Sequence, residues 1–596
     1  MDSTPQPAPP SALPAQDIEQ LFCKGLLILF LAIAVYIPAM SGGYIYDDDL
    51  LLTQNKVVRQ GTGFFDAESW KGLATIWFPT TEESKQWIND YAPLSTTTLW
   101  IEWRLWGEGS PAGYHTTNIL LHAAGALLLW AVLAQMGVRG AWLAGLVWAV
   151  HPVCVESVAW IAERRNVLSM PLLMLTLLAW LRFQSRPAGR RWNDYVLALA
   201  LFAETLLAKS AVAMLPCFLL LWIWWKRDRV TKRDLLETAP FFLLSLALGV
   251  VTIWFQYTRA IADETVPVAA LPHRLASACF ALVFYAWKAA LPVDLMFNYP
   301  EWHNTVPLGA QALGIVPFAV VFAWAWQERA GWGRHVILGL GFFVIMIAPA
   351  LGILKMAYMR ITLVADHFEY VPMAGLIALV AAGLACLPDW LQAPSSRKAV
   401  NVVAGCAVAL LCCLTTARSV VFRDPEALWN DTLAKNPDAW QAHEHLGGVL
   451  SERRDLIGAL EHFQRGVELR PWLGETHNNY GNTLRQLGAN ADLAFQENEK
   501  AAALSPKSVP VVYSYGCALA WANRPLDAIA QFQKVMQLQP REKQSNAMVC
   551  LQIGDLFVEA GDKPQAITYY QKALELDPTL DDARTRIEGL TEAHDK

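Results

Sequence analysis

Runs of apolar residues long enough to cross a lipid bilayer recur from Leu21 to Arg418 and then stop. A run of about 20 such residues is typical of a transmembrane helix. The chain is therefore expected to pass from lipid into water near Phe422, and residues 21–420 are predicted to form a helical membrane domain. The candidate spans are residues 22–40, 117–136, 140–157, 166–183, 194–208, 211–225, 238–257, 275–291, 307–326, 335–354, 370–387 and 399–418.

A large lipid-facing surface agrees with the composition, because 54% of the 596 residues are apolar and 26 are Trp. A soluble protein of this length needs fewer such residues for its cores. Residues 1–20 are rich in Pro, Ala and polar side chains and are predicted to be a disordered tail. The apolar run after them lacks a basic segment and a small-residue cleavage site, so we expect residues 22–40 to be a retained anchor.

Orientation follows from the Lys and Arg residues of short loops, which favour the cytoplasm. Two loops are rich in them, through Arg182, Arg186, Arg190 and Arg191 and through Lys226, Arg227, Arg229, Lys232 and Arg233. Residues 41–116, with ten acidic and five basic residues, then form an exoplasmic loop. Arg397 and Lys398 indicate that the last span runs outward. Residues 275–291 are therefore expected to be interfacial or re-entrant, which leaves about eleven spans.

The soluble tail, residues 424–596, has a regular period. The dipeptides Asn436-Pro437, Arg470-Pro471, Ser505-Pro506, Gln539-Pro540 and Asp577-Pro578 follow one another at intervals of 34, 35, 34 and 38 residues. This is the period of tetratricopeptide (TPR) helix pairs. Four repeats over about 438–578 and a short C-terminal tail are predicted, so the whole chain is expected to be all-α. Stacked repeats form a groove that holds a polypeptide or a partner protein.

Three carboxylates, Asp47, Asp48 and Asp49, follow the first span where the chain leaves lipid. Crowding and partial burial raise the pKa of such carboxyl groups, so that one of them can accept a proton near neutral pH. The alternative is an ordinary solvated loop start.

Three further loops bring polar residues to the same external face. His151, Glu156 and Arg164 lie in one, Lys209 in the second, and Arg360, Asp366, His367 and Tyr370 in the third. Cations and carboxylates at membrane level suit an anionic lipid headgroup. The alternatives are an interfacial His151, an ion pair of Glu163 with Arg164 and Arg165, and a Lys209 that reaches from lipid to the interface.

Several functions are disfavoured by what the sequence contains. A formal charge of −6 without a basic domain argues against a nucleic-acid partner. Neither the ten Cys residues nor the His residues have a spacing that predicts a metal site or a disulfide framework. Charged residues within the candidate spans are few, chiefly Lys24, Glu204 and Lys288, which disfavours a transport pathway.

The chain resembles the transmembrane and TPR-containing O-mannosyltransferases of the GT-C glycosyltransferase superfamily, together with their bacterial relatives. The resemblance covers nearly the whole chain and rests on motifs that occur in the family's order. They are Tyr46-Asp47-Asp48, Tyr91-Ala92-Pro93-Leu94, Tyr114-His115 through His122, His151-Pro152 through Glu156 to Arg164, Lys209-Ser210, Pro292-Val293-Asp294-Leu295, Ala365-Asp366 through Tyr370-Val371-Pro372, and the repeats.

The resemblance implies an enzyme of a bacterial inner membrane, with its site and repeats on the periplasmic side. Such an enzyme transfers a mannose-like hexose from a polyprenyl-phosphate donor to an acceptor such as a protein Ser or Thr, by an inverting displacement. It needs no cofactor, although a divalent metal is compatible. The implied base is Asp47 or Asp48; the donor or substrate contacts are Arg164, Lys209, Arg360, Asp366, His367 and Tyr370; the supporting residues are Asp49, His115, His151 and Glu156.

One departure from the family affects the phosphate ligand. The family more often has Asp-Arg where this chain has Asp366-His367, so Arg360 or a protonated His367 is the expected substitute. Two other functional classes stay open. They are a non-catalytic, membrane-anchored TPR scaffold for envelope assembly, and a polymerase or flippase of lipid-linked glycans.

Overall fold

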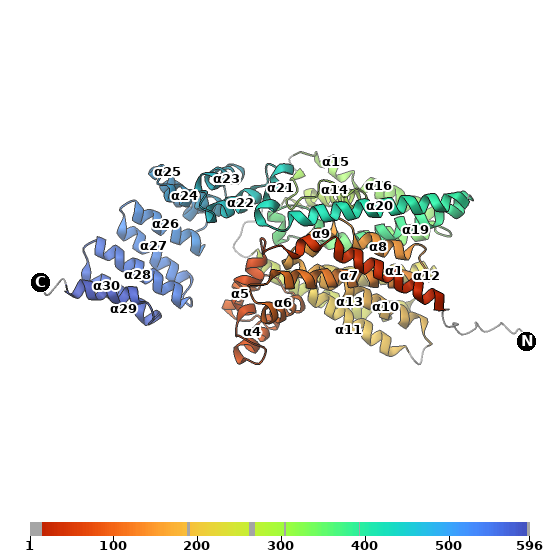
Figure 1. Ribbon diagram of the computed structural model, residues 1–596, viewed down its shortest axis with the longest axis horizontal. Helices are drawn as coiled ribbons and strands as arrows, with labels where there is room; N and C mark the ends of the chain where they lie inside the picture. The colour runs from red at the N-terminus through yellow and green to blue at the C-terminus, as the bar shows by residue number, and fades with distance from the viewer. Residues whose placement is uncertain (1–14, 188–190, 262–268, 303–304, 393, 593–596) are drawn as a thin grey trace, which may run out of the picture. The chain divides into compact units, whose positions relative to one another are not determined.

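The computed structural model describes residues 15–592 except 188–190, 262–268, 303–304 and 393 (Figure 1). The predicted disordered tail, residues 1–20, falls mostly outside this range. The described residues form helices and their connections, without a strand, which confirms the all-α fold. The chain divides into two units, Met1–Asp431 and Thr432–Lys596.

The first unit begins with α1 (Ala15–Ala34) and α2 (Ile37–Met40), followed by a folded loop that carries four helices. These are α3 (Lys56–Arg59), α4 (Ala67–Trp77), α5 (Glu82–Trp87) and α6 (Pro93–Trp106). Leu52, Val58 and Trp100 form a core beneath them with Tyr114 at the start of the next helix. The loop is thus a packed cap on the bundle and not a loose connection.

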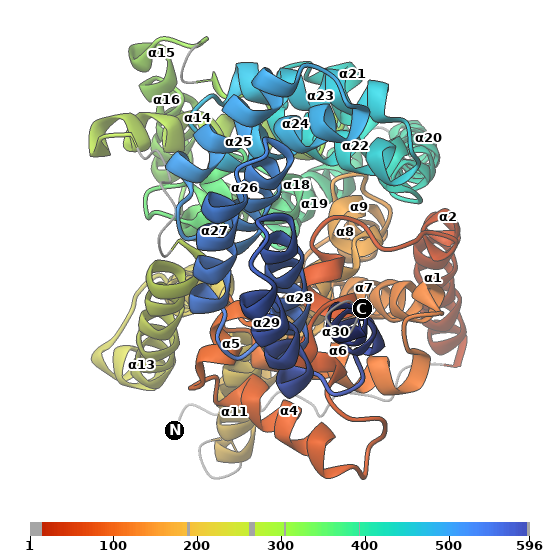
Figure 2. The same ribbon diagram turned by 90° about the vertical axis from the view of Figure 1, so that its left-hand side faces the viewer.

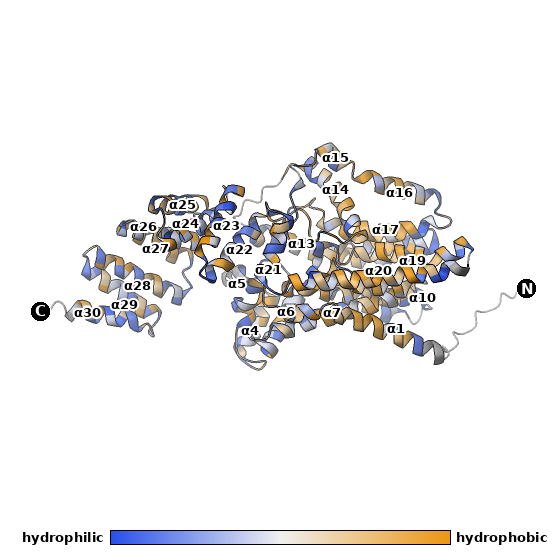
Figure 3. Cartoon of the chain, turned by 45° about the horizontal axis from the view of Figure 1, so that its top comes forward, coloured by the Kyte–Doolittle hydropathy of each residue, from blue (hydrophilic) through white to orange (hydrophobic). Residues whose placement is uncertain are grey.

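The bundle itself is centred on α10 (Arg164–Ser185), which packs between α7 (Pro111–Gln135) and α11 (Trp192–Ala208). The outer helices expose apolar side chains. Figure 3 colours the helices of this unit largely orange, the colour of hydrophobic residues. The remaining helices of this unit are α8 (Ala141–Ala149), α9 (Cys154–Ala159), α12 (Leu215–Arg227), α13 (Lys232–Phe255), α14 (Leu271–Ala290), α15 (Leu308–Ala312), α16 (Ile315–Gln327), α17 (Gly333–Ile347), α18 (Asp366–Glu369), α19 (Met373–Leu391), α20 (Pro394–Val421) and α21 (Pro425–Lys435), which reaches into the second unit.

Seven helical segments in the described part of the chain are long and apolar enough to cross a membrane. They are Pro111–Gln135, Ile161–Ser185, Lys232–Ala260, Leu308–Gln327, Gly333–Ala350, Met373–Leu391 and Ser396–Val421. The helix α14, which was expected to be interfacial or re-entrant, is not among them, and its relation to the membrane stays a prediction.

Residues 140–157 differ from the single span that was predicted there. The helix α8 ends at Ala149, and α9 begins only at Cys154. Pro152 lies between them, and proline has no N–H with which to continue a helix. Nine residues of helix extend only about 14 Å, roughly half of the apolar thickness of a bilayer.

The second unit consists of helix pairs with the spacing that the sequence predicts. They are α22 (Trp440–Glu452) with α23 (Leu456–Leu469), α24 (Gly474–Leu487) with α25 (Ala491–Leu504), α26 (Val509–Trp521) with α27 (Pro525–Leu538), and α28 (Lys543–Glu559) with α29 (Lys563–Leu576), followed by α30 (Asp581–Glu592). The last pairs lie side by side in Figure 2.

Glycine allows the two helices of a pair to approach closely. A Cβ atom on Gly447 would lie 2.8 Å from the ring of Phe463, and one on Gly516 would lie 2.7 Å from the ring of Phe532. The aromatic side chain of the second helix therefore occupies the space that a larger residue would need. This packing repeats with the period of the sequence and produces the stacked array.

Candidate active site

The turn after α2 separates Asp47 from Asp48. Tyr46 has a left-handed backbone with φ +49°. The Asp48 carboxylate, which is fully buried, accepts hydrogen bonds from the backbone N–H groups of Ile45 (2.9 Å) and Ala162 (2.7 Å). Asp48 thereby fastens the turn to the residues that begin α10. Its neighbour Asp49 is exposed and accepts a hydrogen bond from the Thr53 hydroxyl (2.6 Å).

Asp47 is left half-buried among charged groups. Burial raises the pKa of Asp47 to about 6. The positive charges of Arg165, Arg360 and His367 oppose this rise, while Glu163 adds to it. A carboxyl group with such a pKa is ionised at neutral pH but still basic enough to accept a proton. Of the three adjacent aspartates, Asp47 has the surroundings of a general base.

An acid–imidazole pair lies beside Asp47. His367 Nδ1 is 2.6 Å from the Glu156 carboxylate, and its Nε2 is 4.0 Å from Glu163. Burial lowers the pKa of His367, but the two carboxylates outweigh it and raise the pKa above its ordinary value. The two carboxylates therefore favour the protonated form of His367, at the position where relatives were expected to have an arginine.

Asn166 joins this pair to Lys209. The Lys209 ammonium donates to the Asn166 side-chain oxygen at 2.5 Å and lies 3.6 Å from the Glu163 carboxylate. The Asn166 amide nitrogen donates to Glu163 (2.6 Å) and to the His367 carbonyl (2.8 Å). A small hollow beside Lys209 is lined by Asn166 and Phe368. Lys209 is thus held at the cluster.

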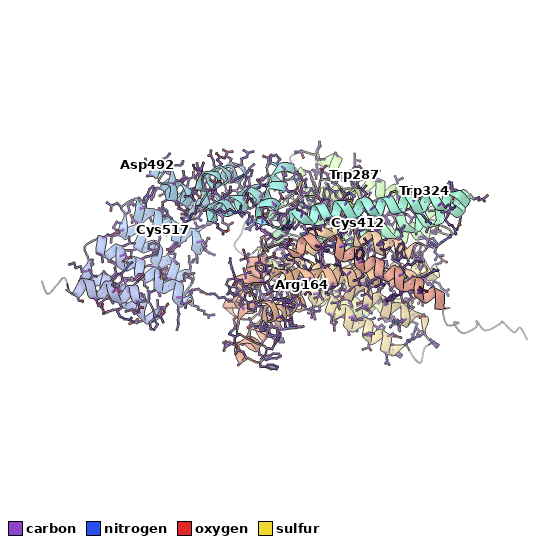
Figure 4. The ribbon with its side chains drawn as sticks, viewed as in Figure 1. Arg164, Trp287, Trp324, Cys412, Asp492 and Cys517 are labelled. Carbon is purple, nitrogen blue, oxygen red and sulfur yellow. The ribbon has the colours of Figure 1, made fainter. Side chains whose placement is uncertain are left out.

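Arg164, which is labelled in Figure 4, is buried inside the bundle of the first unit. Its guanidinium is fully buried and donates to Glu102 (2.6 Å), Asn118 (2.5 Å) and the Tyr114 carbonyl (3.1 Å). These bonds join α10 to α6 and α7 and leave little of the guanidinium for a substrate. The predicted phosphate role therefore does not suit Arg164.

Arg165 was expected only as an ion-pair partner of Glu163 and was not among the predicted site residues. Its guanidinium is a quarter exposed, pairs with Asp90 at 2.5 Å and acts on Asp47. Successive residues of a helix point about 100° apart, so one arginine of the pair faces the bundle and the other faces the site. The Arg-Arg doublet was the available signal. Asn166 was not among the predicted site residues either, because the prediction considered charged side chains and Asn166 is a neutral amide.

Several predicted residues lie around the cluster and bond to protein groups. Asp366 accepts a hydrogen bond from the Tyr299 hydroxyl (2.6 Å), and burial raises its pKa to about 7. The hydroxyl of Tyr370, which is buried, lies 2.9 Å from His122 Nδ1. His151 Nε2 donates to the Ala289 carbonyl at 3.1 Å. These contacts indicate that Tyr370 and His151 hold the helices together.

Two further contacts complete the loop around Asp47. The buried ring of His115 contacts the backbone of Gly42 and Gly43. Gly43 N–H also donates to the Arg423 carbonyl (3.1 Å) at the end of α20. The loop that follows α2 is therefore fixed to both the beginning and the end of the membrane unit.

An aromatic cluster supports the turn on its other side. The ring of Tyr46 packs against Trp160, Phe297 and Trp429 at centroid distances of 5.7, 5.5 and 5.9 Å. Tyr358 packs edge-on against His367 at 5.0 Å. Aromatic packing of this kind fixes the direction in which the Asp47 side chain leaves the turn.

The described residues hold no cluster of three or more His, Cys, Asp or Glu side chains arranged to bind a metal. The site consists of the half-buried carboxylate of Asp47 beside the cations Arg165, Arg360 and His367 and the carboxylates of Glu156 and Glu163. Such an arrangement can remove a proton from a hydroxyl group and stabilise negative charge on a departing phosphate.

Comparisons with known proteins agree with this architecture. The chain is 24% identical over 520 residues to mouse protein O-mannosyl-transferase TMTC4, covering 76% of this chain and 67% of that protein. It is 22% identical over 613 residues to human protein O-mannosyl-transferase TMTC3, covering 92% of this chain and 64% of that protein. A third relative is the Caenorhabditis elegans protein O-mannosyl-transferase F38B6.6, which is 23% identical over 456 residues, covering 75% and 62%. The chain spans about two thirds of the length of these relatives.

The tetratricopeptide repeat family profile matches residues 548–580. Among solved structures, the TPR protein YrrB has a TM-score of 0.25 and 19% identity and covers 28% of this chain and 82% of its own. Pseudomonas aeruginosa pilF has a TM-score of 0.25 and 20% identity, and the match covers 29% of this chain and 77% of pilF. By sequence, the chain is a homologue of the TMTC-family protein O-mannosyl-transferases and carries tetratricopeptide repeats.

Proposed function

We propose that this protein is an integral membrane glycosyltransferase. It transfers a hexose from a polyprenyl-phosphate donor to a Ser or Thr hydroxyl of a polypeptide on the exoplasmic side. The observation that supports it best is Asp47, a half-buried carboxylate with a pKa of about 6 that is surrounded by Arg165, Arg360 and His367. Homology to protein O-mannosyl-transferases supports the reaction class and the protein acceptor.

The displacement uses Asp47 as general base. Asp47 takes the proton of the acceptor hydroxyl while that oxygen forms a bond with the anomeric carbon of the sugar. The bond from this carbon to the donor phosphate breaks, and polyprenyl phosphate leaves with the electron pair. A base positioned in this way contributes about 10²–10⁴-fold to the rate. One displacement inverts the configuration of the anomeric carbon.

Cations of the cluster stabilise the leaving phosphate. Arg165, Arg360 and His367 all act on Asp47, so they are near enough to balance both its charge and that of a phosphate. Lys209 is held by Asn166 at the edge of the cluster. Glu156, at 2.6 Å from His367 Nδ1, favours the protonated form of this ring. In this proposal His367 takes the place of the arginine that is usual in the family.

The repeats offer hydrogen-bonding groups for a polypeptide acceptor. Side chains on successive first helices are joined in pairs: Asn479 to Glu444 (2.8 Å), Asn482 to Ser514 (2.9 Å) and Gln552 to Tyr513 (2.5 Å). We name these residues the polar ladder. In the described structure the side-chain carbonyl oxygens of Asn482 and Gln552 are buried without a hydrogen-bond partner. Such groups favour a ligand that donates hydrogen bonds, as the N–H groups of an extended peptide do.

The test compares Asp47→Asn with Asp49→Asn, because Asp49 is an exposed neighbour with the same side chain. Both proteins are reconstituted with a labelled polyprenyl-phosphate mannose and a Ser/Thr-rich polypeptide, and the label transferred to polypeptide is measured. Asp47→Asn is expected to lower the transfer rate by about 10²–10⁴-fold, and Asp49→Asn to leave it within a few-fold of wild type. Full activity of Asp47→Asn would remove Asp47 as the base, and no transfer by wild type from any hexose donor would favour a TPR scaffold.

A further inference from the structure

A large cavity lies in the membrane unit, towards the opposite ends of the helices from Asp47. It has a volume of about 590 Å³ and is lined by α7, α10, α12, α17 and α19. Small residues of two helices, Gly339, Ala378 and Gly383 among them, make room for it. The volume falls in the range of about 300–1,000 Å³ that is typical of small-molecule sites.

The cavity is apolar and lies at membrane depth. Four of its walls belong to segments long and apolar enough to cross the membrane, namely Pro111–Gln135, Ile161–Ser185, Gly333–Ala350 and Met373–Leu391. Most of its lining side chains are aliphatic or aromatic, such as Leu133 and Phe342. A buried water needs two to four polar partners, so an apolar cavity of this kind is not stably hydrated. In a bilayer, the apolar group available to fill such a cavity is the acyl chain of a lipid.

One end of the cavity has the features of a bilayer surface. Arg139, Trp225 and His335 line this end, and the Trp225 indole donates to His335 Nδ1 at 3.1 Å. Further tryptophans gather nearby, where Trp224 stacks on Trp326 with 5.5 Å between ring centroids. Tryptophan is enriched where a membrane protein crosses from lipid to water. The rim therefore lies at the level of lipid headgroups.

Charge at this rim is positive. Arg139 forms an ion pair with Asp389, and Arg397 bonds to the same carboxylate at 3.1 Å, so two cations share one anion. Both arginines are more than half exposed. The loops that follow α10 and α12 at this end carry the lysine and arginine clusters that mark a cytoplasmic face. Basic pockets between helices on that side bind the headgroups of anionic lipids.

We propose that this cavity binds an anionic phospholipid, with an acyl chain inside and its phosphate at Arg139 and Arg397. The apolar walls take the chain, and the shared Asp389 leaves the rim with the positive charge that a phosphodiester needs. This inference is independent of the proposed reaction, since none of these residues belongs to the cluster around Asp47.

The donor lipid is a less suitable occupant. The active-site hollow beside Lys209 is a separate space, lined by Asn166, Met346 and Phe368. Trp225 lines the rim of the cavity. It lies ten residues after Leu215, the first residue of α12, which is the end of the helix near Lys209. The rim is therefore about 15 Å along the helix axis from that end. A donor whose phosphate lies at Lys209 would leave the rim arginines without a partner phosphate.

The experiment fills the cavity with a side chain. An added Cβ on Gly383 meets no atom within 4 Å, and the same holds for Gly405 on α20, which does not line the cavity. Gly383→Phe and Gly405→Phe are therefore matched variants. Full-length protein is purified from membranes that contain phosphatidylglycerol and phosphatidylethanolamine, and the retained lipids are identified by native mass spectrometry and lipid extraction.

Wild type and Gly405→Phe are expected to retain phosphatidylglycerol, and Gly383→Phe to lose it by about tenfold or more. Arg139→Ala with Arg397→Ala should fold and lose the preference for phosphatidylglycerol over phosphatidylethanolamine. The proposal is overturned if Gly383→Phe retains as much lipid as Gly405→Phe, or if the double arginine variant keeps the headgroup preference. Recovery of polyprenyl phosphate as the only bound lipid would also overturn it.

Discussion

Asp47 and Asp48 are adjacent in the chain, but their carboxylates have different surroundings. Asp48 accepts two backbone hydrogen bonds and is fully buried, whereas Asp47 is half-buried among Arg165, Arg360 and His367. The left-handed backbone of Tyr46 and its aromatic neighbours fix the turn that separates them. The two residues therefore differ in what their substitution should do.

Asp48→Asn should lower the stability of the protein. The molecules that do fold should keep the wild-type rate of hexose transfer. The amide can accept only through its oxygen, so one of the N–H groups of Ile45 and Ala162 loses its acceptor. A buried donor without a partner costs about 1–3 kcal/mol. Thermal unfolding of the purified protein measures this loss, with Asp49→Asn as the exposed control. Equal unfolding temperatures for the two variants would contradict the structural role of Asp48.

The reaction should depend on pH through Asp47. Its pKa is raised to about 6, so the carboxyl group is protonated and inactive as a base below that value. The kcat/KM for acceptor polypeptide is expected to fall as pH decreases through about 6 and to level off above it. The residual activity of Asp47→Asn should lack this step. A pH profile that is the same in both proteins would assign the titration to another group.

Most charged residues of the candidate site could be named from the sequence, but which of them face the site and which stabilise the fold could not. Lys209, Arg360, Asp366 and His367 were found because ionisable groups at membrane level are rarely placed without a function. The sequence gives no reason to prefer Arg164 or Arg165, because the choice depends on the rotation of α10. Glu102 in another helix settles it by holding Arg164 inside the bundle.

Elements were predicted best where one local pattern dominates. The spacing of the five proline dipeptides predicted the four helix pairs from Trp440 to Leu576, since each pair contacts mainly its neighbours. Residues 140–157 were less predictable, because hydropathy alone does not show that Pro152 divides an apolar run into α8 and α9. The helical packing within the repeats permits a sharp test.

Gly447→Ala and Gly448→Ala should have opposite effects. A Cβ on Gly447 would lie 2.8 Å from Phe463, while one on Gly448 meets no atom within 4 Å. Overpacking should destabilise the repeats by about 1–3 kcal/mol in the first variant. Alanine in place of an unobstructed helical glycine should stabilise the second by about 0.5–1 kcal/mol. Hydrogen exchange of α22 and α23 in the intact protein measures both, and equal protection would contradict the packing argument.

The whole molecule combines a membrane unit, which holds the candidate site, with a unit of repeats. If the proposed function is correct, the first unit binds the donor and the second binds the polypeptide. Each unit has its own core, so a change in the polar ladder should not disturb the site. Donor use and acceptor use are then separable by mutation.

Asn482→Ala with Gln552→Ala should impair acceptor use alone. These side chains hold the buried carbonyl oxygens that lack partners in the described structure. The KM for polypeptide is expected to rise by about tenfold, equivalent to about 1.4 kcal/mol, while slow transfer of the hexose to water continues at the wild-type rate. Asp492→Ala, a change on α25 outside the polar ladder, serves as control. An unchanged KM would place acceptor binding elsewhere.

The bond between Gly43 and Arg423 has a consequence for how the protein is made. The turn that carries Asp47 is supported by Arg423 and Trp429, which the ribosome adds about 380 residues later. At about 5–20 residues per second this interval lasts roughly 20–80 s. A nascent chain therefore lacks these two supports of the turn until its last membrane helix has been made.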